Sequence, residues 1–194
     1  MRKLFRISAM TAVALGTIAF SAEAQRAKQF GIVGGVAINS ISGDDFDGTD
    51  SRTGFMGGFY VAVPVGTSID IEPEVLYVQK GINDANSDVH LDNGYIQVPV
   101  LFRYNFNPAG GPYILAGPAI AFSISCDLKD DTDSVSCDDI GLEPETAFSG
   151  VVGLGFQKNR FGLEARYDFD FGDTYKDTAG KNSAFEILAR IMIK

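Results

Sequence analysis

The sequence predicts an all-β protein: one eight-stranded, antiparallel, up-and-down transmembrane β-barrel. Three observations lead to this fold class. Apolar and polar residues alternate with period 2 in every ordered-looking segment, the segments are unusually long, and short connections alternate with long ones. The alternation is clearest over 161–172, where every odd-numbered residue is apolar and every even-numbered residue is charged or glycine. Successive side chains of a strand point to opposite faces, so this strand has an apolar face and a charged face.

The first 24 residues have the pattern of an export signal. Three basic residues precede an apolar run from Ile7 to Phe20, and Ala22 and Ala24 fit a small-x-small cleavage site. The run is too short for a transmembrane helix, which needs about 20 residues. We therefore expect a signal peptide over 1–24 and an outer-membrane β-barrel domain over 25–194. No later stretch is apolar enough for a membrane helix, so only a closed barrel would place the mature chain in a membrane.

The mature chain is strongly acidic. The signal carries three basic residues and one glutamate, so its removal changes the formal net charge from −9 to −11. Such a chain lacks the basic face that nucleic-acid binding requires, and we expect no nucleic-acid partner. The sequence also leads us to expect no cofactor.

Two cysteines, Cys126 and Cys137, follow the signal. Export to an oxidising compartment favours a disulfide between them. A zinc site is the weaker alternative, because two thiols need further ligands and the only histidine, His90, lies in another segment. We therefore predict a disulfide and no metal centre.

The expected strands are about 11–13 residues long, whereas a tilted strand crosses a bilayer with about 9–11 residues and strands of soluble proteins usually have about 5 or 6. They cover 29–39, 53–65, 69–81, 94–106, 112–124, 146–157, 161–172 and 183–193. The connections at 66–68, 107–111 and 158–160 are short, and those at 40–52, 82–93, 125–145 and 173–182 are long. Outer-membrane barrels have short periplasmic turns and long outer loops, so both features favour a membrane.

The long connections carry most of the acidic residues. They would make the cell-surface end of the barrel strongly negative. Solvated loops explain this pattern, and the alternative is binding of divalent cations, which prefer carboxylate ligands. No segment has the EF-hand spacing, and 45–50 comes nearest to it.

Charged residues of both signs collect on one face of the predicted sheet. The candidate lumen network comprises Asp70, Glu72, Glu74, Arg103, Glu164, Arg166, Asp168, Asp170, Glu186 and Arg190. The interior of an eight-stranded barrel is only wide enough for its own side chains, so we interpret these residues as ion pairs that plug the lumen. The alternative is a path for protons or small ions. Aromatic residues near the strand ends, among them Tyr95 and Tyr113, indicate two interfacial girdles, although Tyr95 falls on the polar parity.

Four segments carry a resemblance to a known family: 71–81 (IEPEVLYVQKG), 95–104 (YIQVPVLFRY), 111–118 (GPYILAGP) and 161–167 (FGLEARY). They resemble the outer-membrane β-barrel domain of the PorT-like, "porin family" proteins of Bacteroidetes and related phyla. The resemblance extends over nearly the whole mature chain. It implies an outer-membrane barrel, and it implies neither a demonstrated pore nor an assigned activity.

These observations favour a small integral outer-membrane protein with a structural or surface-interaction role, in contact with outer-membrane lipid. Two alternatives stay open. A soluble periplasmic lipocalin-like barrel would turn the apolar face inward to bind a ligand. An enzyme that modifies lipid A would need a catalytic group near the membrane boundary, for which Ser87, His90 and Asp92 form a weak constellation. We expect no enzymatic activity, and the sequence indicates no particular protein partner.

Overall fold

The computed structural model describes residues 26–42, 49–84, 90–129, 134–136, 146–172 and 181–194, and in these ranges the chain forms only strands and their turns. The strands are β1 (Gln29–Ser42), β2 (Thr49–Pro64), β3 (Ile69–Asp84), β4 (His90–Asn105), β5 (Gly111–Lys129), β6 (Ser134–Ser136), β7 (Ala147–Lys158), β8 (Phe161–Asp170) and β9 (Lys181–Met192). The described residues contain no helix that is long and apolar enough to span a membrane.

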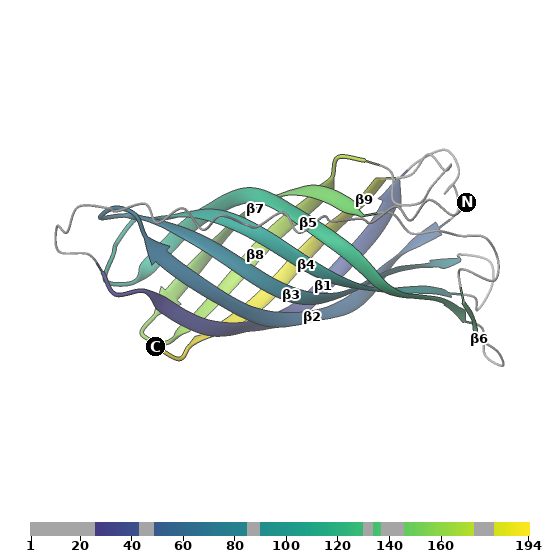
Figure 1. The fold of residues 1–194 in the computed structure, drawn as a ribbon, viewed down its shortest axis with the longest axis horizontal. Helices are drawn as coiled ribbons and strands as arrows, with labels where there is room; N and C mark the ends of the chain where they lie inside the picture. The colour runs from purple at the N-terminus through teal and green to yellow at the C-terminus, as the bar shows by residue number, and fades with distance from the viewer. Residues whose placement is uncertain (1–25, 43–48, 85–89, 130–133, 137–145, 173–180) are drawn as a thin grey trace, which may run out of the picture.

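The sheet closes on itself. Its order is β4-β3-β2-β1-β9-β8-β7-β5, every neighbouring pair is antiparallel, and pairing of β4 with β5 joins the two ends. The short strand β6 pairs only with the far end of β5, so it extends one hairpin beyond the barrel wall (Figure 1). The predicted fold class, a closed eight-stranded antiparallel barrel, is confirmed.

All eight predicted barrel strands are present, and several continue beyond their predicted ends on the long-loop side. For example, β5 continues to Lys129, and β6 was not predicted at all. The tight turns lie at the opposite end of the barrel, where the C-terminus also lies (Figure 1).

Three prolines inside the barrel wall coincide with breaks in residue pairing. The pairing of β2 with β3 is interrupted beside Pro73, that of β3 with β4 beside Pro99, and that of β4 with β5 beside Pro118. Proline has no N–H to donate, so a ladder hydrogen bond is lost at each position. A closed barrel has no free edge for these residues, and it accommodates them through local gaps in the ladder.

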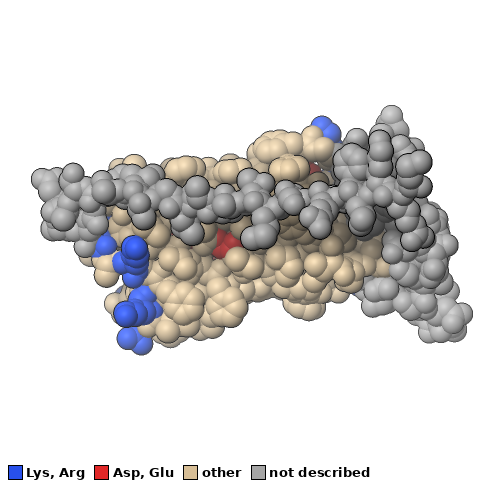
Figure 2. Space-filling view, in the orientation of Figure 1, with Lys and Arg blue, Asp and Glu red and all other residues tan. Residues whose placement is uncertain are grey.

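The apolar face of the sheet points outward. Phe161 and Leu163 on β8 are 66% and 64% exposed, and large apolar side chains are exposed on the other barrel strands as well. Along the visible side of the barrel, surface residues are almost all uncharged (Figure 2). The outer surface therefore has the apolar character that contact with lipid requires.

Two aromatic residues that the sequence placed in the girdles lie inside the barrel. Tyr113 is 1% exposed and Tyr95 is 2% exposed, so both fill the lumen, and their assignment to the girdles was wrong. The physical reason is clear for Tyr113. The first part of β5 is apolar on both faces, so polarity could not show which parity points inward.

Candidate functional site: the charged lumen

All ten residues of the predicted lumen network lie inside the barrel, each with at most 7% of its surface exposed. They project from four strands, β3, β4, β8 and β9. Every Asp or Glu side chain whose burial the structure describes belongs to this set. None of these described side chains presents a carboxylate to lipid on the outer wall of the barrel.

Arg166 on β8 forms the central contacts. Its two terminal nitrogens donate to the two carboxylate oxygens of Glu74 on β3 at 2.7 and 2.8 Å, a bidentate geometry. Its Nε also donates to Glu164 at 2.7 Å. Four strand-to-strand steps separate β3 from β8 in either direction around the barrel, so the Arg166–Glu74 pair joins opposite walls.

Arg190 on β9 extends the same network toward the short-turn end. Its guanidinium bonds Glu72 at 2.7 Å and also forms a short ion pair with Glu164. It lies 3.8 Å from the centre of the Tyr60 ring, which adds a cation–π contact. Tyr113 donates its hydroxyl hydrogen to Glu164 at 2.6 Å, so this carboxylate has three partners.

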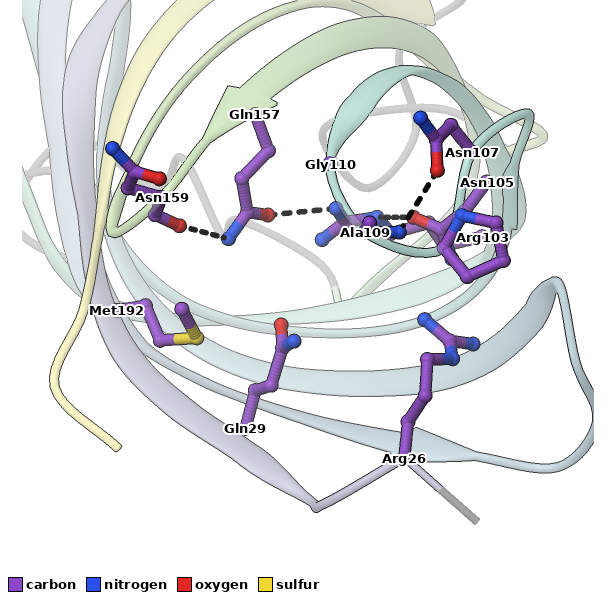
Figure 3. Close-up of a pocket in the computed structure, with 11 residues that line it drawn as sticks. Arg26, Gln29, Arg103, Asn105, Asn107, Ala109, Gly110, Gln157, Asn159 and Met192 are labelled. Atoms are coloured by element: carbon purple, nitrogen blue, oxygen red, sulfur yellow. Dashed lines mark hydrogen bonds between the residues drawn. The ribbon is translucent and has the colours of Figure 1, made fainter. Parts of the chain in front are cut away.

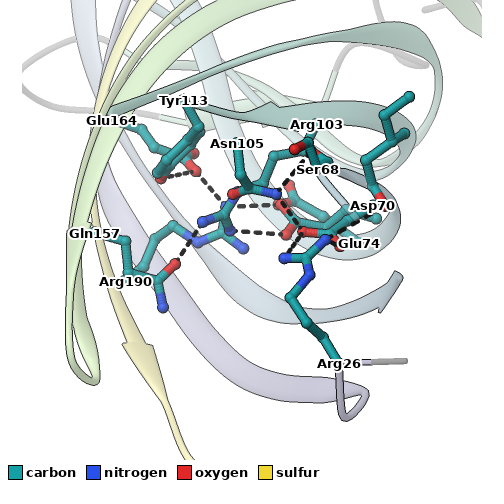
Figure 4. Close-up of polar contacts among 12 residues, drawn as sticks. Arg26, Ser68, Asp70, Glu74, Arg103, Asn105, Tyr113, Gln157, Glu164 and Arg190 are labelled. Atoms are coloured by element: carbon teal, nitrogen blue, oxygen red, sulfur yellow. Dashed lines mark hydrogen bonds and ion pairs between the residues drawn. The ribbon is translucent and has the colours of Figure 1, made fainter. Parts of the chain in front are cut away.

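Arg103 on β4 is the third arginine of the network. It donates to Asn105 at 2.9 Å and to Gln157 at 2.7 Å, and it stacks 3.8 Å from the Tyr113 ring centre. Its contact with Glu72 is longer, at 3.4 Å. Figure 4 shows these residues converging from different walls of the barrel. Three arginines thus face three glutamates, so this part of the lumen is close to neutral.

Asp70 lies below this cluster, at the short-turn mouth. It accepts a hydrogen bond from Asn105 at 2.7 Å and pairs with Arg26, which precedes β1, at 2.5 Å (Figure 4). A small polar cavity of about 80 Å³ lies at this mouth, lined by residues that include Arg26, Arg103 and Gln157 (Figure 3). A volume of that size suits a few water molecules rather than an organic solute.

The half of the lumen nearer the long loops has a different charge balance. Asp168 accepts a hydrogen bond from Gln97 at 2.5 Å, and Asp170 lies 3.8 Å from the ammonium of Lys80. Together with Glu186 these acids outnumber the one buried lysine of the described residues. One carboxylate oxygen each of Asp168 and Asp170 is buried without a hydrogen-bond partner in the protein. This half is therefore rich in acceptors and net acidic, although within the described ranges no three His, Cys, Asp or Glu side chains are arranged to hold a metal ion.

Sequence reasoning missed the uncharged and terminal members of the network. Gln97 and Asn105 lie at odd-numbered positions of β4, as Arg103 does, and Lys80 lies at an even-numbered position of β3, as the acidic residues of that strand do. The alternation along these strands could therefore have identified all three as lumen residues. Arg26 had no such signal, because it lies outside the predicted strands.

Other predicted positions lie partly or wholly outside the described residues. Cys126 is in β5, but Cys137 is not described, so the disulfide stays a prediction. Ser87 is also outside, and His90 is the first residue of β4. Most acidic residues of the long connections lie outside too, and so does the predicted signal peptide.

Comparisons with known proteins agree with this architecture. The family described as "Outer membrane protein beta-barrel domain" matches residues 20–176. Neisserial surface protein A is similar in structure, with a TM-score of 0.58 and 11% identity over 86% of this chain and 99% of that one. Ail of Yersinia pestis, in complex with the heparin analogue sucrose octasulfate, gives a TM-score of 0.53 and 16% identity over 87% of this chain and 100% of that one. No curated protein sequence matches the chain.

Proposed function

The chain belongs to the outer membrane protein β-barrel family, and from this premise we propose that it is a small integral outer-membrane protein with a structural or surface-interaction role. Its lumen is plugged by the charge network, and it is not an enzyme. Within the family, the segments quoted above favour the PorT-like "porin family" group. The long connections at one end of the barrel would form its cell-surface face.

The contact between Arg166 and Glu74 supports the plug most directly. The pair joins opposite walls at 2.7–2.8 Å, so the two side chains together reach across the lumen. The guanidiniums of Arg103 and Arg190, which stack on tyrosine rings inside the barrel, support the plug as well. The interior of an eight-stranded barrel is only wide enough for side chains, and this supports the proposal that these groups close it.

Conductance in planar lipid bilayers tests the plug. The purified protein should give no steady, discrete current steps, whereas the double variant Arg166→Ala/Glu74→Ala should give small steps, because it removes the side chains that join the walls. Arg160→Ala, in the exposed β7–β8 turn, is the matched control and should behave like the parent. Steady steps from the parent protein would show an open channel and overturn the proposal.

Cell fractionation tests the location. The protein should sediment with outer membranes and require detergent for extraction, because large apolar side chains cover the outside of the barrel. The mature protein should begin at Gln25, and its two thiols should resist alkylation until a reductant is added. A soluble periplasmic protein released without detergent would instead support the lipocalin-like alternative.

Lipid A analysis separates this proposal from the enzyme alternative. Mass spectrometry of lipid A from cells with and without the gene should show the same acyl pattern. A pattern that changes with the gene, and that is restored by the parent but not by His90→Ala, would support a lipid A-modifying enzyme.

The acidic outer connections lead us to propose divalent cations as their partners. Ail binds an anionic sugar, sucrose octasulfate, in its complex. The charge of the connections in this chain favours the opposite sign of ligand. Titration with Ca²⁺ followed by calorimetry should show binding that is lost when the acidic residues of 125–145 are changed to amides. Equal heats for parent and variant would refute cation binding there.

A further inference from the structure

A hollow lies on the outer surface of the barrel, lined by residues of three neighbouring strands. A groove of about 360 Å³ lies on β7, β8 and β9 near the short-turn end, and its lining includes Phe156, Phe161, Leu163, Ala189 and Ile191. Its volume falls within the range of roughly 300–1,000 Å³ that is typical of small-molecule sites. Because the lining is almost wholly apolar, the groove suits a hydrocarbon chain.

Strand register explains the hollow. Leu163 on β8 lies opposite Ala189 on β9, and Phe161 lies opposite Ile191. The single methyl of Ala189 forms a low floor beside side chains that project far from the wall, since Phe161 and Leu163 are the two most exposed large apolar residues described. A chain lying over Ala189 would therefore contact apolar side chains on both sides.

Basic residues gather at the same end of the barrel. Among the Lys and Arg side chains whose burial the structure describes, five are exposed, and four of them, Lys28, Lys158, Arg160 and Lys194, lie at the short-turn end. The fifth, Lys181, begins β9 at the opposite end. Figure 2 shows basic side chains grouped at the short-turn end on the left of the view.

Two of these four residues, Lys158 and Arg160, lie beside the groove. Lys158 is one of the groove's lining residues and pairs with Phe161 across the β7–β8 turn. The carbonyl of Arg160 accepts from the backbone N–H of Met192 on β9 at 2.7 Å. The carbonyl of Lys194 accepts from Phe30 of β1, also at 2.7 Å. The only described acidic side chain at this end, Asp70, is buried and paired with Arg26.

From the groove and this basic border, we propose that the barrel binds an anionic glycerophospholipid of the periplasmic leaflet. One acyl chain lies in the groove over Ala189, and the phosphate lies between Lys158 and Arg160. Short turns face the periplasm in outer-membrane barrels, so the groove opens at the depth of that leaflet's headgroups. Basic residues near a membrane surface favour anionic lipids, and no Asp or Glu side chain whose burial the structure describes is exposed beside them.

Native mass spectrometry with dioleoyl phosphatidylglycerol and dioleoyl phosphatidylcholine tests the site, because the two lipids share acyl chains and differ in headgroup charge. The detergent-solubilised protein should retain one phosphatidylglycerol in preference to phosphatidylcholine. Each basic residue contributes about fivefold to binding, so Lys158→Gln/Arg160→Gln should weaken retention by about tenfold or more. Lys181→Gln, the exposed lysine at the other end, is the matched control and should retain phosphatidylglycerol like the parent.

A second variant tests the acyl groove separately from the charge. Ala189→Phe fills the floor and should reduce retention of phosphatidylglycerol while leaving all four basic residues in place. Heat-modifiable migration on gels establishes that each variant is folded. If Ala189→Phe does not fold, the comparison of Lys158→Gln/Arg160→Gln with Lys181→Gln still tests the lipid site. Equal retention of the two lipids by the parent, or equal loss in Lys181→Gln and Lys158→Gln/Arg160→Gln, would overturn the proposal.

Discussion

Replacement of Arg166 by alanine should destabilise the barrel more than any other single change in the lumen. The side chain is 1% exposed and bonds Glu74 through both terminal nitrogens. Its loss leaves Glu74 buried without the two hydrogen bonds that Arg166 supplies, whereas Glu164 keeps Arg190 and Tyr113. Removing one partner of a buried ion pair costs about 3–5 kcal/mol, and we expect a loss of that size.

The contacts of Arg103 predict a smaller effect for Arg103→Ala. Its ion pair with Glu72 is longer, at 3.4 Å, and Glu72 keeps Arg190 at 2.7 Å. The loss then consists mainly of hydrogen bonds to Asn105 and Gln157, for which about 1–3 kcal/mol is expected. The predicted order of stability is therefore parent, Arg103→Ala, Arg166→Ala.

Urea unfolding in phospholipid-free detergent measures these differences. The chain has no Trp, so circular dichroism and the heat-modifiable gel shift are the suitable signals. Arg160→Ala is the matched control, because this exposed turn residue should change stability by less than about 0.5 kcal/mol. Unchanged unfolding midpoints in both Arg166→Ala and Arg103→Ala would refute the argument that the network stabilises the barrel.

A double variant separates the lost ion pair from the lost volume. If the cost of Arg166→Ala comes from the uncompensated charge on Glu74, then Glu74→Gln in the same chain should restore part of the stability. Coupling between contacting groups is typically about 0.5–3 kcal/mol. A double variant with simply additive losses would show instead that the cavity left by the arginine, rather than the charge, causes the destabilisation.

Two further changes test contacts that the alternation alone does not reveal. Tyr113→Phe removes the hydroxyl that donates to Glu164 and should lower the free energy of unfolding by about 1.5–3 kcal/mol, whereas Tyr167→Phe on the outer face should have little effect; equal effects would contradict the buried hydrogen bond. Gly35→Ala should greatly reduce the yield of folded barrel, because the added Cβ would overlap the carbonyl oxygen of Ile187 in β9, whereas at Gly34 the nearest atom is 3.5 Å away. Similar yields of heat-modifiable protein from the Gly35→Ala and Gly34→Ala variants would contradict that close approach.

Much of the fold was predictable because a closed barrel repeats one simple rule along the chain. Period-2 alternation assigned the two faces of β3, β8 and β9, and the lengths of the connections assigned the two ends of the barrel. All ten predicted lumen residues are buried for this reason. The rule failed in the first part of β5, where odd-numbered and even-numbered residues are both apolar. Tyr113 was therefore placed on the wrong face.

The partners within the lumen were not predictable from alternation. Glu74 and Arg166 are 92 residues apart in sequence, and they meet because the closed strand order places β3 opposite β8. The outer groove has the same origin, since Ala189 and Leu163 lie side by side only in the register of β8 with β9. Parity assigns a residue to a face, and register then decides which residues on that face are neighbours.

The separation of charge along the barrel axis connects the lumen with both proposed ligands. In the middle of the lumen, three arginines balance three glutamates, so this level needs no counter-ion. The excess of acid lies toward the long connections, while four of the five exposed Lys and Arg side chains whose burial the structure describes lie at the short-turn end. Cations at the outer end and an anionic phospholipid at the inner end would each neutralise the local excess. The two ends should therefore respond independently: amide substitutions in 125–145 should abolish Ca²⁺ binding without changing phosphatidylglycerol retention, and Lys158→Gln/Arg160→Gln should do the reverse.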